Sequence, residues 1–222
     1  MSEWWTYSLT DFLLFSPRTY YRLFELYNEA VWPAHVAAIA LGLAILAFTR
    51  LGDGRSIAAI LTAAWLWVAI AFHFQRYATI NWAAIYFAAA FAFQAMLIMQ
   101  TGVRRNRLVL AHEGSLFARV GLALFLFALF VQPFVGMAFG REWKQAEVFG
   151  LAPDPTTVAT LGVLLMAERT HWHLMLIPLL WCAFTGLTLV AMEAPDAFVT
   201  PALAALALLA AAWKTVVSFR KP

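Results

Sequence analysis

Residues 115–139 read SLFARVGLALFLFALFVQPFVGMAF and carry a single charged side chain, that of Arg119. A helix of about 20 apolar residues crosses a hydrocarbon core about 30 Å thick, so this stretch indicates a membrane-spanning helix. Five further runs have the same character and are apolar around their whole circumference. They cover residues 33–49, 56–75, 80–101, 172–192 and 198–218. Turn residues at 52–54, 101–102 and 194–196 separate neighbouring runs.

The composition of the whole chain indicates a protein surrounded by lipid. Of its 222 residues, 64% are hydrophobic and only 12% are charged, whereas about 25% are charged in a typical soluble domain. So few charges cannot cover a water-facing surface. The net charge of +3 does not indicate a nucleic-acid partner, because the basic residues are scattered between apolar runs. The single cysteine, Cys182, excludes an internal disulfide and a multi-thiolate metal site.

A seventh, shorter apolar segment covers residues 155–168, and only three residues separate it from the next run. That spacing favours a tight helical hairpin. The sequence therefore predicts an all-α polytopic transmembrane helical bundle with seven spans, with six spans as the alternative. In the seven-span arrangement most Lys and Arg residues share one side with the C-terminus. This predicts a protein of the bacterial inner membrane with its N-terminus outside and its C-terminus in the cytoplasm.

The first 32 residues have a different pattern. Ser16 and Pro17 are placed as the N-cap and first residue of a helix. Apolar side chains then recur on one face, opposite a charged face, at Tyr20, Leu23, Phe24, Tyr27 and Val31. This pattern predicts an amphipathic helix lying in the membrane interface. We therefore divide the chain into an interfacial segment, 1–32, and a transmembrane domain, 33–219.

Four stretches, in this order, extend along nearly the whole chain: WWTYSLTDFLLFSPRTYYRLFELYN (4–28), INWAA (80–84), FGLAPDPTTVATLGVLL (149–165) and IPLLW (177–181). Their order and spacing resemble an uncharacterised bacterial membrane family, domain of unknown function 6064. The Pro-Thr-Thr motif followed by Ile-Pro-Leu-Leu-Trp is the most specific part. The resemblance implies a multi-pass membrane fold, and it implies no particular activity.

The segment Pro153-Asp154-Pro155-Thr156-Thr157 is the most informative candidate site. Asp154 is placed to cap a helix that starts at Pro155. A helix over residues 155–168 rises only about 21 Å, so we expect its N-terminal end to lie below the membrane surface. Broken-helix transporters bind solutes and ions at such ends. Pro133 and Pro178 predict kinks in two nearby spans.

These features favour a small-solute permease or channel-like protein with an outward-facing polar cavity. The expected cavity residues are His73, Arg76, Asn81, Gln132, Asp154, Thr156 and Thr157. The alternative is a non-catalytic membrane subunit or scaffold of a larger complex. The expected partners are the lipid bilayer and either further copies of this chain or a membrane complex. We assign no catalytic residue, and the sequence leaves open whether the chain is an enzyme, with a non-enzyme favoured.

A third hypothesis is a histidine-based metal or haem membrane protein. Its candidate ligands are His35, His73, Glu168, His171 and His173. Seven spans place His35 and His73 across the bilayer from His171 and His173, so one four-histidine site requires six spans. On a helix, His171 and His173 would also lie on different faces. We therefore expect no metal and no cofactor.

Basic residues near the predicted cytoplasmic side have a simpler interpretation. Four arginines are expected in or near one loop that contacts lipid headgroups, with recognition of anionic lipids as the functional alternative. They are Arg104, Arg105, Arg107 and Arg119. Lys214, near the end of the last span, is expected to extend its ammonium group to the membrane surface.

Overall fold

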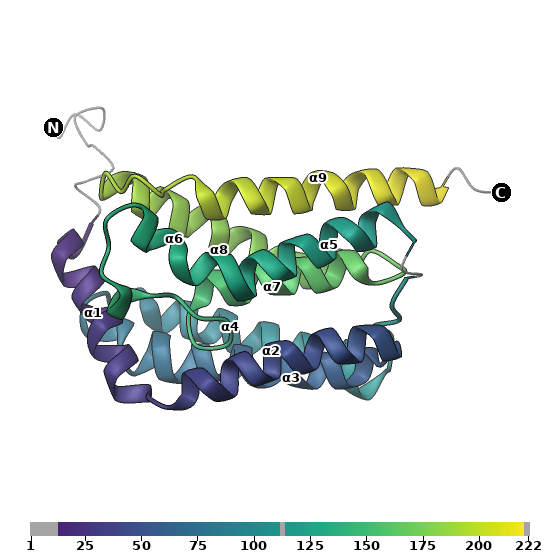
Figure 1. Cartoon of the computed structure of the whole chain (residues 1–222), viewed down its shortest axis with the longest axis horizontal. Coiled ribbons are helices and arrows are strands. Elements are labelled where there is room, and N and C mark those ends of the chain that lie inside the picture. Colours follow the sequence, from purple (N-terminus) through teal and green to yellow (C-terminus); the bar gives the residue numbers. More distant parts are fainter. Residues whose placement is uncertain (1–12, 112–113, 220–222) are drawn as a thin grey trace, which may run out of the picture.

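The computed structural model describes residues 13–111 and 114–219, and helices packed side by side make up this part of the chain (Figure 1). Six helices are long and apolar enough to cross a membrane, which confirms the predicted fold class and the six strong apolar runs. They are α2 (Ala34–Leu51), α3 (Gly54–Trp67, continued to Thr79), α4 (Ala84–Ile98, continued to Arg104), α5 (Leu116–Leu126, continued through α6, Gln132–Ala138), α8 (Trp172–Ala191) and α9 (Val199–Phe219).

The long helices run between two ends of the bundle (Figure 1). We call one of them the α1 end, because α1 lies there beside the connections 75–83, 139–152 and 192–198. The other, the far end, holds the connections 52–53 and 167–171, the described residues 105–111 and 114–115, and the end of α9.

Helix α1 (Pro17–Val31) lies across the α1 end of the bundle and does not run alongside the long helices (Figure 1). Its N-cap Ser16 accepts a hydrogen bond from the Thr19 amide, as the sequence predicts. Phe24 and Tyr27, on the predicted apolar face, pack their rings on Phe72, with centroids 5.1 and 5.4 Å apart. The amphipathic face therefore covers protein at the end of the bundle. Residues 1–12 of the predicted interfacial segment lie outside the described part.

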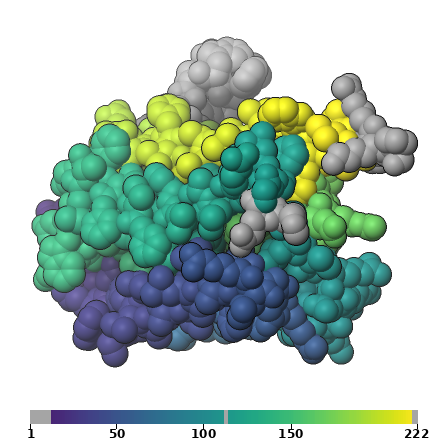
Figure 2. Space-filling model, turned by 45° about the vertical axis from the view of Figure 1, so that its right-hand side comes forward, coloured from purple at the N-terminus to yellow at the C-terminus, as the bar shows by residue number. Residues whose placement is uncertain are grey.

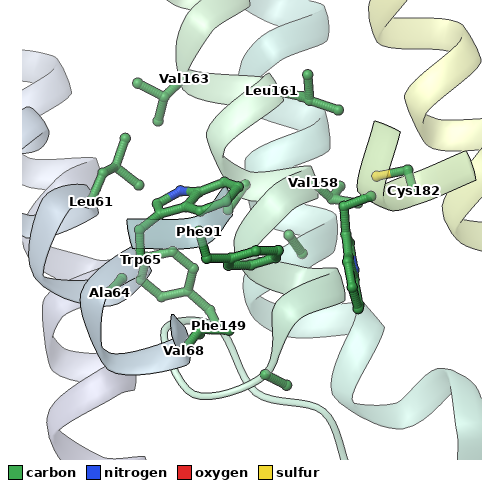
Figure 3. Close-up of a cluster of buried hydrophobic side chains, with 14 of the residues drawn as sticks. Leu61, Ala64, Trp65, Val68, Phe91, Phe149, Val158, Leu161, Val163 and Cys182 are labelled. Carbon is green, nitrogen blue, oxygen red and sulfur yellow. The ribbon is translucent and has the colours of Figure 1, made fainter. Parts of the chain in front are cut away.

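Helix α7 (Pro153–Met166) occupies the centre of the bundle, and all of its 14 residues are buried. It contacts α3, α5, α8 and α9. It begins toward the α1 end and finishes at the far end (Figure 1), alongside the six long helices, but with 14 residues it is shorter than the candidate membrane spans. Figure 3 shows the apolar interior beside it, where the rings of Trp65 and Phe91 lie 4.4 Å apart.

Glycine allows α7 to approach α5 at backbone distance. A Cβ atom on Gly162 would lie 2.6 Å from the Gly121 carbonyl oxygen and 2.9 Å from the Phe125 nitrogen. Small residues at membrane helix contacts permit such approach, because lipid supplies no hydrophobic force between helices. The α5–α7 contact therefore depends on the absence of a side chain at both glycines.

The predicted turn at Thr101-Gly102 is wrong, because the helix continues as a π-helical segment to Arg104. Gly102 serves packing instead, since a Cβ atom there would collide with the Ala58 side chain. Lys214 also departs from expectation. It is 8% exposed and donates to the carbonyl oxygens of Leu165 and Ala167. Its ammonium group thus satisfies the C-terminal carbonyls of α7 instead of reaching the membrane surface.

Candidate functional site

The loop that precedes α7 carries the chain from the α1 end into the bundle interior. Phe149 and Leu151 are buried, and Gly150 turns with φ +77° where it lies against Ala38 and Ala64. The Tyr27 hydroxyl donates to the Leu151 carbonyl at 2.9 Å, which ties the loop to α1. The first turn of α7 therefore lies inside the protein, and the expected depth of this helix end below the membrane surface stays a prediction.

Asp154 does not cap α7, so that prediction is wrong. The helix begins at Pro153, its N-cap is Ala152, and no side chain caps it. Proline is favoured at the first helical position because it has no amide hydrogen to satisfy, and Pro153 starts the helix two residues earlier than expected. This shift places Asp154 within the first turn and turns its carboxylate sideways, toward α8 and α9.

Three neutral groups hold the Asp154 carboxylate. The Trp181 indole nitrogen donates to Oδ1 at 2.7 Å, and the hydroxyls of Thr200 and Thr185 donate to Oδ2 at 3.0 and 3.3 Å. Asp154 is only 5% exposed. A buried carboxylate is costly unless hydrogen bonds replace its water, and these three donors supply that replacement. Asp154 thus links α7 to both α8 and α9.

A second polar group lies closer to the surface of the α1 end. The Arg141 guanidinium contacts the Glu147 carboxylate at 3.1 Å and the Asp196 carboxylate at 2.5 Å. It lies against Gly136, where a side chain would collide with it. Asp196 Oδ1 and the Gln132 side-chain oxygen are buried without hydrogen-bond partners. We call Glu147, Asp196 and Arg141 the acidic cluster.

The acidic cluster has more carboxyl groups than guanidinium groups, and the pKa of Glu147 is raised. Burial and, after it, the negative charge of Asp154 raise the pKa of Glu147 to about 7 against the opposing effect of Arg141. The pKa of Arg141 is itself raised, because its two carboxylate partners outweigh the effect of burial. Glu147 is therefore the member of the cluster that we expect to change protonation near neutral pH.

The raised pKa of Glu147 predicts that the free energy of unfolding falls as the pH rises. The folded protein holds the Glu147 proton more tightly than the unfolded chain, so its contribution is full below the ordinary pKa of 4.5 and is lost as the pH rises through about 7. In detergent we expect the melting temperature to fall by several degrees between about pH 5 and pH 8. Glu147→Gln, which keeps a hydrogen-bond acceptor for Arg141, should flatten this slope. An unchanged slope in the variant would contradict the assignment to Glu147.

The remaining predicted cavity residues lie in several places. Thr156 and Thr157 are fully buried, and their hydroxyls donate to the Ala152 and Asp154 carbonyls of the same chain segment. His73 is buried with its ring 4.8 Å from that of Trp181, and neither ring nitrogen has a hydrogen-bond partner.

The other three lie closer to the α1 end. Asn81 is buried and accepts a hydrogen bond from the Ala83 amide. Gln132 lines a narrow crevice beside Arg141, whereas Arg76 lines a separate pocket of about 410 Å³ beneath α1. The structure thus gathers Asp154, Thr156 and Thr157 on one helix, with His73 behind the Trp181 ring, and it sets Arg76 and Asn81 apart.

The candidate metal ligands fall at opposite ends of the bundle. His35 contacts Asn28 at 3.2 Å near the α1 end, where His73 also lies, while His171 and His173 lie at the far end. The rings of His171 and His173 are 5.9 Å apart, closer than expected, because His171 precedes α8 and is not helical. Within residues 13–111 and 114–219, no three His, Cys, Asp or Glu side chains are grouped to hold a metal ion.

Sequence reasoning missed the partners of Asp154. Trp181 and Thr185 are four residues apart on α8, so they share one helix face, and this polar pair inside an apolar run was the available signal. Thr200, at the start of α9, carried no comparable signal.

Comparison with known proteins identifies one related family. The model of a family of unknown function, DUF6064, matches residues 18–221. No curated protein and no solved structure shows significant similarity to the chain.

Proposed function

Because the chain belongs to the DUF6064 family, whose function is unknown, we propose its function from the Asp154 site: a small-solute permease that opens toward the α1 end. In this proposal Asp154 takes up and releases a proton or a cation together with the solute. The observation that carries the proposal is a carboxylate buried in a membrane bundle and held by neutral donors alone. Ionisable groups at such depth commonly mark ion and proton pathways.

Polar side chains between the α1 end and Asp154 support this role. Arg141 and Glu147 are each slightly exposed, with side chains 13% and 12% accessible, and Arg141 contacts Asp196. Asp196 precedes Thr200 by four residues, and Thr200 donates to Asp154. Beyond Asp154, by contrast, α7 ends in the apolar segment 161–166, which is fully buried. The site is therefore polar toward the α1 end and closed by apolar side chains toward the far end, and transport requires α7 to shift.

The charge distribution supports an orientation for this permease. The far end carries Arg105, Arg107 and Arg169 on exposed positions, and basic loops favour the cytoplasmic side. We accordingly propose a bacterial inner-membrane protein whose α1 end faces outward and whose C-terminus is cytoplasmic.

Asp154→Asn tests the proposal most directly. After a hyperosmotic shift with acetate, urea or glycerol, we expect proteoliposomes containing the unaltered protein to reswell or acidify faster than protein-free liposomes with at least one of these solutes. Asp154→Asn preserves the size of the side chain but abolishes its charge, so it should return the flux to the protein-free level. Light scattering and an entrapped pH dye measure the two processes. Asp53→Asn is the matched control, because Asp53 only caps α3 and asparagine caps helices equally well.

A second function, that of a non-catalytic membrane subunit or scaffold, is favoured by the packing of α7. Thr156, Thr157 and Thr160 all donate their hydroxyls to carbonyls of their own helix or its lead-in residue, which leaves none of these hydrogens for a solute. Flux equal to that of protein-free liposomes for every probe, from folded protein, would reject the permease and leave this alternative.

A further inference from the structure

A pocket of about 690 Å³ lies at the far end, remote from Asp154. Two connections that are far apart in the sequence form it: residues 105–111 after α4, and residues 167–171 between α7 and α8. In Figure 2, where this end is turned forward, the green α7–α8 connection lies beside the teal segment that follows α4.

Backbone hydrogen bonds fix the two connections to each other. Leu110 and Ala167 form an antiparallel bridge, in which Ala111 donates to the Met166 carbonyl at 2.8 Å and Glu168 donates to the Val109 carbonyl at 2.7 Å. Gly54 allows the Leu108 carbonyl to lie directly against the start of α3. The walls of the pocket are therefore positioned by the fold, although their side chains are exposed.

The lining side chains are mainly basic. They include Arg105, Arg107, Arg169, His171 and His173, opposed by the carboxylate of Glu168. No salt bridge in the described part of the chain involves these three arginines. The sequence placed Arg105 and Arg107 in one loop, and only the structure brings Arg169 and the two histidines beside them.

His171 is partly buried among positively charged groups. Burial lowers the pKa of His171, and the charges of His173, Lys214 and Arg107 lower it further. Its Nε2 atom is buried and has no hydrogen-bond partner among the described residues. His173 Nε2 lies 3.1 Å from the Thr101 hydroxyl, which orients the second ring. An anion in the pocket would offset these positive charges and accept hydrogen bonds from guanidinium groups.

We propose that this pocket binds a phosphate group, carried by an anionic lipid headgroup or by a small soluble phosphate. Guanidinium groups bind phosphate oxygens with two parallel, charge-assisted hydrogen bonds, and arginines from two separate loops contribute them. Basic pockets between membrane helices commonly bind lipid headgroups in this way. The proposal does not depend on the transport role of Asp154.

Two binding measurements on the full chain distinguish the two sources of phosphate. Inorganic phosphate is titrated into detergent-solubilised protein by calorimetry, and retention of phosphatidylglycerol from mixed phosphatidylglycerol and phosphatidylcholine nanodiscs is followed by native mass spectrometry. Phosphate binding without lipid retention identifies a soluble anion, and lipid retention identifies a headgroup. Either result supports the pocket if the variants described next behave as expected.

The test variant is the triple substitution Arg105→Gln, Arg107→Gln and Arg169→Gln. We expect it to weaken binding of phosphate or phosphatidylglycerol by at least about tenfold. The control triple, Arg50→Gln, Arg55→Gln and Arg104→Gln, removes the same charge from the same end without altering the pocket lining, and should bind like the unaltered protein. Equal loss in both triples, or no binding by the unaltered protein, would overturn the proposal.

Two further measurements test the proposal even if the triple arginine variant does not fold. Glu168→Gln removes the opposing carboxylate, so it should tighten binding severalfold. Phosphate should also raise the pKa of His171 in a histidine NMR titration. Weaker binding by Glu168→Gln, together with an unchanged His171 titration, would overturn the proposal independently of the arginine variants.

Discussion

Replacement of Gly162 by leucine should abolish folded, monodisperse protein in detergent. The Cβ atom alone would lie 2.6 Å from the Gly121 carbonyl oxygen and 2.9 Å from the Phe125 nitrogen. Both are backbone atoms, so no side-chain rotation can relieve the collision, and α7 would have to move away from α5. Overpacking of a well-packed core costs about 1–3 kcal/mol and occasionally more. We expect the upper part of this range or beyond it, because α7 is buried on every side.

The measurement is size-exclusion chromatography followed by thermal unfolding, with Gly162→Ala as an intermediate step. Gly114→Leu is the matched control, because a Cβ atom on Gly114 meets nothing within 4 Å. If Gly162→Leu and Gly114→Leu elute and melt alike, then α5 and α7 are not in backbone contact.

Arg141→Met should produce the second large effect. It leaves Asp196 and Glu147, with side chains 4% and 12% exposed, without their shared cation. Removing one partner of a buried ion pair costs about 3–5 kcal/mol, because the remaining charge stays buried. For a chain of this length the melting temperature should fall by roughly 10 °C. The fall should be smaller at acidic pH, where the Glu147 carboxyl is protonated.

Lys144→Met provides the matched comparison. Lys144 pairs with Glu29 at 3.3 Å, but both side chains are about half exposed, at 43% and 53%, and exposed pairs contribute about 0–1 kcal/mol. The triple variant Arg141→Met, Glu147→Gln and Asp196→Asn should recover much of the stability, since no charge is then left unpaired. Similar losses from Arg141→Met and Lys144→Met would show that the acidic cluster is not buried as described.

The helices were predictable because lipid imposes a local requirement. A crossing needs an uninterrupted apolar run of fixed length, and the run 172–192 corresponds closely to α8 at Trp172–Ala191. Helix ends were less predictable at glycines, because a glycine can mark either a turn or a close contact between helices. Gly102 was predicted to form a turn, but it lies within a continuous helix. Glycine is needed there because a side chain would collide with Ala58.

The site was only partly predictable, since its partners are set by tertiary contacts. The sequence indicated that Asp154 lies at a helix start, and the structure places it, buried, in the first turn of α7. Local capping preference then suggested the wrong partner for its carboxylate. The true donors belong to α8 and α9, between 27 and 46 residues away along the chain. Likewise, no local pattern pairs Arg141 with Asp196, because both lie in connections that only the folded bundle brings together.

The central position of α7 has a consequence for how the protein is made. Fourteen residues that include an aspartate, two prolines and three threonines form too short and too polar a segment to partition into lipid from the translocon by itself. The helices that shield its carboxylate and its terminal carbonyls, α8 and α9, are synthesised after it. We therefore expect membrane integration of α7, the innermost helix, to be completed only after synthesis of α9.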